Sequence, residues 1–156
     1  MHAQARSLSL TSIKASVQFW PVELVFYERY NEPGTFAIKV LCNDLALDPK
    51  AWIGQRLTLT IAPKDQAARV LSAHVQKISA EHTLNHGYRF YTLHMTSWLG
   101  LLAQTENCSS FVNANVPDII DRAWAVSKLT DINSSQLNAE YLPREYTVQY
   151  NESQLD

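Results

Sequence analysis

The sequence predicts a mainly β protein with short helices, an α+β fold, and three observations lead to this prediction. Apolar and polar residues alternate over residues 35–41 and 56–62, which is the period of strands with one buried face. A turn-forming stretch, residues 81–87, separates two further β-like runs. Only one stretch, beginning at Val116, has clear helical spacing.

The two alternating runs each place three apolar side chains on one face. Burial of such a side chain contributes about 1.5–3 kcal/mol, so the alternation constrains the register of each strand. The predicted inward sets are Phe36, Ile38 and Val40 in the first run, and Leu57, Leu59 and Ile61 in the second.

Between these strands, residues 47–54 predict a helix of one to two turns. Asp48 can accept hydrogen bonds from the free N–H groups at its start, and Pro49 presets φ there. Gly54 can end it in the left-handed conformation. Strands are then expected at 70–79 and 88–95, joined by a turn in which Asn85 and Gly87 tolerate unusual φ.

The second half of the chain predicts a short helix at 97–104, an extended piece at 109–115 and a longer helix from Val116. Asn115 is a suitable cap for that helix, Pro117 lies in its first turn, and Asp118 favours the positive end of its dipole. One helix face is expected to be core: Val116, Ile119, Ile120, Ala123 and Trp124.

Residues 145–150 predict a strand, with Tyr146 and Val148 on the face opposite Glu145 and Thr147. The last six residues contain no cap and no cluster of breakers. We therefore expect that the polypeptide continues beyond Asp156.

Composition and charge exclude several classes of protein. Hydrophobic residues are 46% of the chain and charged residues 18%, which is too apolar for a disordered segment. The net charge of −2 gives no basis for binding nucleic acid or an anionic membrane. There is no signal-peptide pattern and no run that could span a membrane. Cys42 and Cys108 are too few for a disulfide framework and are expected to be buried or half-buried thiols.

No catalytic or cofactor site is predicted. His82 and His86 are four residues apart, but they fall in the predicted turn and lack a third ligand, so surface histidines are the better interpretation. Nucleophile and phosphate-loop motifs do not occur. The carboxylate pairs suit other roles: Asp118 and Asp121 at a helix start, Glu23 and Glu28 on a solvated strand edge.

The aromatic residues allow an alternative, a β-rich module that binds carbohydrate or protein without catalysis. Most of them are expected to be core, including Trp52 and Trp124 on inward helix faces. Residues 19–30, however, have apolar side chains at both odd and even positions, so both faces of this strand could be covered. In a small domain the second cover could come from another chain.

Four stretches resemble the N-terminal region of the valine-glycine repeat protein G (VgrG) family of type VI secretion spikes, which is similar to the phage tail-hub (late control gene D) proteins. They are residues 47–60, 97–102, 111–121 and 141–156, and the last is the most specific. Order and spacing agree from about Val22 onward. The chain departs from the family at Ser72 and Ala73, at Gly100, and over its first twenty residues. The matching positions are Asp48, Pro49, Gly54, Trp98, Val116, Pro117, Asp118, Ile119, Pro143, Arg144, Glu145, Tyr146, Tyr150, Glu152 and Ser153.

The resemblance implies a structural role without enzymatic activity and without cofactors. It implies a β-barrel-like tube module of the tail-hub type (16–110) and the start of a following α/β module (111–156), while the N-terminus before them (1–15) is expected to be poorly ordered. Three copies of the full-length protein would form a pseudo-hexameric ring that joins the hexameric inner tube, made of Hcp, to the spike.

Further expectations concern partners and location. Baseplate components are implied partners and effectors are possible ones, with no nucleic acid and no membrane insertion by this region. The protein is expected to be made in the cytoplasm and delivered outside the cell or into a target cell by the injection machine.

Overall fold

The computed structural model describes residues 8–11, 17–63, 66–85, 87–125, 133–137 and 139–155. The chain divides into two compact units, Met1–Trp98 and Leu99–Asp156, which are considered in turn. His86, residues 126–132 and Asn138 are among those outside the described ranges.

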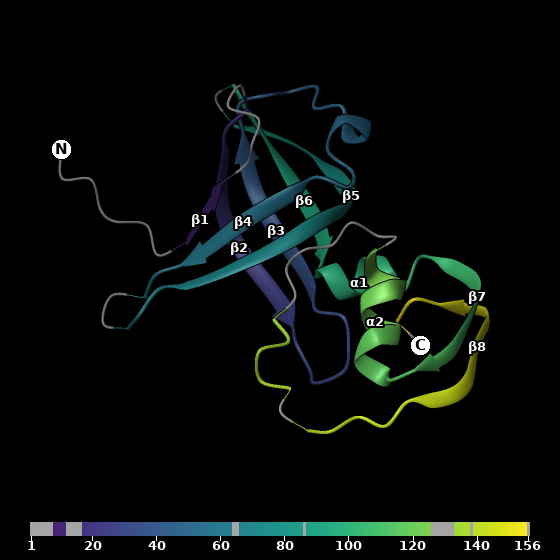
Figure 1. Cartoon of the computed structure of the whole chain (residues 1–156). Helices are drawn as coiled ribbons and strands as arrows, with labels where there is room; N and C mark the ends of the chain where they lie inside the picture. The colour runs from purple at the N-terminus through teal and green to yellow at the C-terminus, as the bar shows by residue number, and fades with distance from the viewer. Residues whose placement is uncertain are drawn as a thin grey trace. The chain divides into compact units, whose positions relative to one another are not determined.

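The first unit is a six-stranded antiparallel sheet that curls into a nearly closed barrel (Figure 1). Its spatial order is β1-β4-β5-β6-β3-β2, and the edge strands β1 and β2 approach each other at the seam. This confirms the predicted β-barrel-like fold. The strands are β1 (Leu8–Thr11), β2 (Phe19–Tyr27), β3 (Thr35–Cys42), β4 (Arg56–Ile61), β5 (Arg69–Asn85) and β6 (Tyr88–Thr96).

Alternate residues of the strands form the core inside this barrel. The predicted inward face of β3 is confirmed, and in β4 Leu57 and Leu59 are buried while Ile61 is partly buried against the core. β6 contributes Tyr91, Leu93 and Met95 to the same core. Because a shift by one residue would turn every one of these side chains to solvent, burial fixes the register of the sheet.

The predicted short helix is a single 3-10 turn, Pro49–Ala51. The Asp48 carboxylate accepts a hydrogen bond from the Lys50 N–H at 3.0 Å, as its capping role predicts. Gly54 has φ +80, in the left-handed region, and its N–H donates to the Val75 carbonyl at 2.8 Å. The turn thereby places Trp52 in the core, edge-on to Phe19 with 4.9 Å between ring centroids.

A buried tyrosine anchors the loop that precedes this turn. The Tyr91 hydroxyl donates to the Asp44 carbonyl at 3.0 Å and accepts from the Leu47 N–H at 3.2 Å. Both loop groups are therefore satisfied in a largely apolar environment, where an unpaired polar group would be costly.

Two predictions for the first unit are wrong. β5 continues through residues 81–85, so the predicted turn is much shorter and His82 lies on a strand. The barrel needs this length because Leu84 and Asn85 still pair with β6 after a register shift. The N-terminus is not entirely poorly ordered, since Leu8–Thr11 form β1 and pair with β4; the other residues of 1–15 lie outside the described ones.

The second unit consists of a short helix, two antiparallel strands and a helix. We call the strand pair the β7–β8 hairpin, although a helix and a long connection, and not a tight turn, separate its strands in the sequence. The elements are α1 (Trp98–Leu102), β7 (Glu106–Ala114), α2 (Val116–Ala125) and β8 (Arg144–Ser153). β7 and β8 pair antiparallel, with a register shift between Asn107 and Cys108. Asn151 and Asn113 have positive φ within these strands. The four predicted elements are present, although both strands are longer than predicted.

Two predictions for the second unit also need correction. The apolar face of α2 is not core, because none of its residues is buried; Val116 is 37% exposed and the others on this face are half-buried. Cys108 is exposed, since its position on β7 faces away from α2, whereas Cys42 is buried as predicted. The boundary between residues 110 and 111 that the family resemblance implies remains a prediction. The two compact units of this chain divide between Trp98 and Leu99.

We expect Leu93→Ala to destabilise the first unit by about 2–5 kcal/mol, because Leu93 is fully buried between Ile38 and Ile78 and the substitution leaves a cavity. Urea unfolding followed by tryptophan fluorescence measures this loss. The control Val70→Ala lies on β5 at 61% exposure and should change the stability by about 0.5 kcal/mol or less. Equal losses for the two variants would contradict the assigned register.

The two thiols should differ in reactivity. Burial raises the pKa of the Cys42 thiol above its usual 9.0, so folding favours the neutral form. The stabilisation that the buried neutral Cys42 thiol gives the fold is complete below the thiol pKa of the unfolded chain. It is lost as the pH rises through the higher thiol pKa of the folded protein. With a thiol reagent at pH 8, we expect one fast equivalent from Cys108 and a second only on unfolding. Fast reaction of both thiols in the folded protein would contradict the buried position of Cys42.

Candidate assembly surfaces

The edge strand β2 exposes an apolar surface on the first unit. We call it the β2 surface and define it by Val22, Val25 and Tyr27, which are 59%, 45% and 69% exposed. The strand register shifts between Pro21 and Glu23, and Val22 lies at this shift without a partner in the pairing of β2 with β3. This explains why β2 has apolar residues at both odd and even positions. One set points into the barrel, and the other points outward and stays exposed.

An ion pair and a cation–π contact lie at the C-terminal end of β2. The Arg69 guanidinium, at the start of β5, pairs with the Glu28 carboxylate and lies 5.6 Å from the centre of the Phe26 ring. Phe26 in turn stacks on Phe36, with 6.3 Å between ring centroids. Since β5 and β2 are not neighbours in the sheet, these contacts connect two strands that share no backbone pairing.

The β7–β8 hairpin exposes a second apolar surface, on the second unit. We call it the hairpin surface and define it by Val112, Tyr146, Val148 and Tyr150, which are 59%, 64%, 48% and 77% exposed. Tyr146 is the direct partner of Val112, and Tyr150 is the partner of Cys108. Directly opposed residues share a face, so these side chains form one continuous patch.

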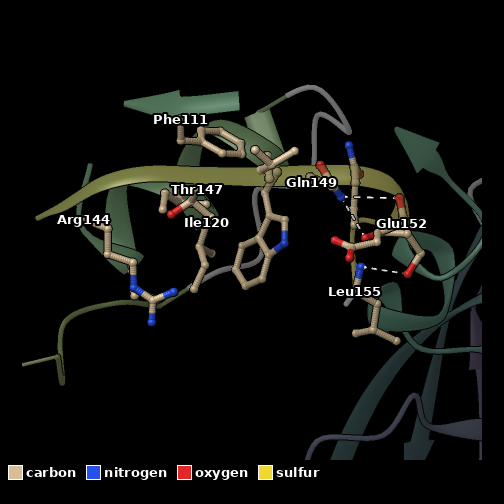
Figure 2. Close-up of a pocket in the computed structure, with 14 residues that line it drawn as sticks. Phe111, Ile120, Arg144, Thr147, Gln149, Glu152 and Leu155 are labelled. Atoms are coloured by element: carbon tan, nitrogen blue, oxygen red, sulfur yellow. Dashed lines mark hydrogen bonds between the residues drawn. The ribbon is translucent and has the colours of Figure 1, made fainter. Parts of the chain in front are cut away.

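The other side of the hairpin borders an apolar hollow of about 380 Å³ under α2 (Figure 2). Phe111 and Thr147 line it from the hairpin, and Ile120 lines it from α2. The Gln149 side-chain amide donates to the Ser153 carbonyl at 2.8 Å, and the Leu155 N–H donates to the Ser153 hydroxyl at 3.2 Å. These bonds fold the last described residues toward the hollow, and Leu155 contributes to its lining.

The positions that carry the family resemblance have local structural roles. In the first unit, Asp48, Pro49 and Gly54 form the 3-10 turn described above. The Asn115 amide oxygen accepts from the Asp118 N–H at 2.9 Å and caps α2 as predicted. The remaining positions lie as follows: Trp98 begins α1; Val116, Pro117, Asp118 and Ile119 form the first turn of α2; Pro143 precedes β8; Arg144, Glu145, Tyr146, Tyr150, Glu152 and Ser153 lie on β8.

Of the residues considered for catalysis, the described carboxylates have other neighbours, while the side chains of His82 and His86 lie outside the described part of the chain. Within the described ranges, no group of three or more His, Cys, Asp or Glu side chains could hold a metal ion. Glu28 pairs with Arg69, and Asp118 lies in the first turn of α2. No helix in the described part of the chain is both long and apolar enough to cross a membrane.

Sequence reasoning found one of the two exposed surfaces. The apolar residues at both odd and even positions of 19–30 indicated the β2 surface, but the sequence analysis did not identify the hairpin surface. Its signal was available, because Tyr146, Val148 and Tyr150 recur with period 2 while Thr147 and Gln149 alternate with them. That pattern was interpreted only as a strand, since nothing in it shows which face is covered.

A small β barrel with an apolar edge, followed by a hairpin with an apolar outer face, is typical of a module that is built into a larger assembly. The chain belongs to the phage tail baseplate hub (GPD) family, whose model matches residues 27–156. This confirms the resemblance to tail hubs inferred from the sequence.

Three relatives from Pseudomonas aeruginosa are type VI secretion system spike proteins. VgrG1b is 26% identical over 83% of this chain, VgrG1c is 27% identical over 76%, and VgrG4b is 29% identical over 96%. This chain spans only 17%, 16% and 18% of their respective lengths.

A solved structure has the same fold. It is the E. coli c3393 protein, described as a component of the type VI secretion system with structural similarity to the T4 bacteriophage tail proteins gp27 and gp5. The two chains superpose with a TM-score of 0.74 at 18% identity, over 94% of this chain and 40% of that one. The barrel and the hairpin unit therefore both belong to a known hub fold.

Because α2 has no buried residue, its cap should matter more than usual. We expect Asn115→Ala to cost about 1 kcal/mol of local stability, since the Asp118 N–H loses its partner. Hydrogen exchange should show faster exchange in the first turn of α2 and no change in β6. The control Asn133→Ala removes a similar bond to the Ser135 N–H in an exposed turn and should leave α2 unchanged. Unchanged exchange in α2 of the Asn115 variant would contradict the capping role.

Proposed function

We propose that this chain is the N-terminal hub portion of a type VI secretion spike protein, with a structural role. The observation that carries the proposal is the family match over residues 27–156, supported by the relatives named above. In this role the full-length protein forms a trimer that joins the hexameric inner tube to the spike.

The barrel provides a physical reason for this role. β2 is an edge strand whose apolar surface is left open, and such an edge invites association with another chain. A closed ring covers surfaces of this kind while limiting the number of copies. The hub must hold together under mechanical load, which requires buried apolar contacts between copies and no chemical step.

The proposal includes partners and a destination. The inner-tube protein Hcp is the proposed partner at the tube end, with baseplate components at its periphery, and effectors are possible further partners. The region binds no nucleic acid, does not insert into membranes and performs no catalysis. After synthesis in the cytoplasm, the assembled hub is delivered outside the cell or into a target cell.

Sedimentation of the full-length protein at micromolar concentration tests the proposal. We expect trimers, because an obligate interface buries at least about 2,000 Å² and dissociates little at such concentrations. A second measurement is recruitment of the hexameric tube protein to the trimer. Monomers alone at micromolar concentration would contradict the proposed hub function.

A further inference from the structure

The outer face of the barrel carries basic side chains on strands β4, β5 and β6. We call this set the cationic patch and define it by Arg56, His74, Lys77 and His94. Each of the four adjoins, along its strand, a side chain that packs inside the barrel, so each points outward. Arg56 and Lys77 are exposed, and the two histidines are half-buried.

The sheet register brings these four groups together. Arg56 lies directly opposite His74 on β5, and the Lys77 position lies directly opposite His94 on β6. His74 is also opposite Thr96, which is two residues after His94, so the two pairs adjoin on β6. Since opposed side chains of a sheet share one face, the four groups form one continuous patch.

No described carboxylate lies opposite these four residues or two positions from them along their strands. Two carboxylates lie elsewhere on this face, and both are beside Lys39. Glu81 pairs with the Lys39 ammonium at 2.9 Å, and Glu23 is opposite Lys39 on β2. The neighbours of the patch instead carry hydroxyl groups or a methyl group: Ala37, Thr58, Ser72, Ser79, Thr92 and Thr96.

A patch of this kind is complementary to an anionic partner, and its size distinguishes two classes of partner. Proteins that bind duplex nucleic acid neutralise many phosphates, often about 6–10, with Lys and Arg side chains. The patch holds only two permanent cations, and the chain as a whole is anionic, with a net charge of −2. Guanidinium, ammonium and imidazolium groups all donate hydrogen bonds to carboxylates. The patch therefore fits a short acidic protein segment better than a nucleic acid.

We propose that the cationic patch docks a carboxylate-rich segment of another protein. Arg56 and Lys77 provide permanent positive charge, and the two imidazoles add charge and N–H donors when they are protonated. Because an ordinary imidazole becomes cationic below about pH 6.5, the contact strengthens as the pH falls through that range. This inference goes beyond the proposed hub function, since it depends only on the outer face of the barrel.

Fluorescence anisotropy of a labelled octa-aspartate peptide with the 156-residue chain tests the proposal. At low salt we expect binding to be about tenfold tighter near pH 6 than near pH 8, because Asp remains ionised while the imidazoles gain charge. The double variant His74→Gln and His94→Gln should bind equally at the two pH values. No binding at either pH would overturn the proposal.

A charge-reversal pair supplies the matched control. Lys77→Glu should weaken binding of the peptide about tenfold at pH 6, because it places a carboxylate inside the patch. Arg122→Glu makes the same change in net charge on the exposed side of α2, and should change the affinity by less than about twofold. Equal losses from the two variants would overturn the assignment to this patch.

Two further measurements need no variant. Amide shifts on addition of the peptide should centre on residues 72–77 and 92–96; shifts confined to other strands would overturn the proposal. A DNA duplex of equal charge should bind more weakly than the peptide, and equal or tighter binding of the duplex would contradict the choice of an acidic protein segment. Neither result affects the trimer, which sedimentation of the full-length protein tests separately.

Discussion

The structure depends on the burial of one face of a single curled sheet. Phe36, Ile38 and Val40 from β3 meet Leu93 and Met95 from β6 inside the barrel, and almost every strand contributes alternate side chains to that interior. The other features follow from this constraint. The 3-10 turn at Asp48 inserts Trp52 into the core, and the Tyr91 hydroxyl fixes the preceding loop. With its interior filled, the barrel can leave the outer side of β2 uncovered.

Much of this arrangement could be predicted from the sequence because it depends on local patterns. Period-2 alternation identified the inward residues of β3 and β4, and the capping residues identified the turn at Pro49 and the start of α2. These features depend on spacing along the chain and on the conformational preferences of Asp, Pro, Gly and Asn. The family motif in β8 could also be recognised from the sequence, because its residues are nearly contiguous.

The errors share a different physical origin. The length of β5 is set by how far β6 remains available as a partner, which residues 81–85 do not encode locally. The apolar face of α2 has core spacing, yet amphipathicity indicates only that a face can be covered, and here it borders an open hollow. The burial of Cys108 was predicted wrongly, because the exposure of a residue on this strand pair depends on which of its faces the helix covers. Each of these facts requires tertiary structure.

Pro21 in β2 has a consequence for the form that any assembly can take. Proline lacks a backbone donor, and the register shift beside it distorts the strand edge, so a straight strand from another molecule cannot pair along its whole length. Contact through β2 therefore favours side chains over a continuous backbone ladder. A protein with an exposed apolar surface on its edge strand thus avoids continued cross-β growth, and its copies remain discrete molecules.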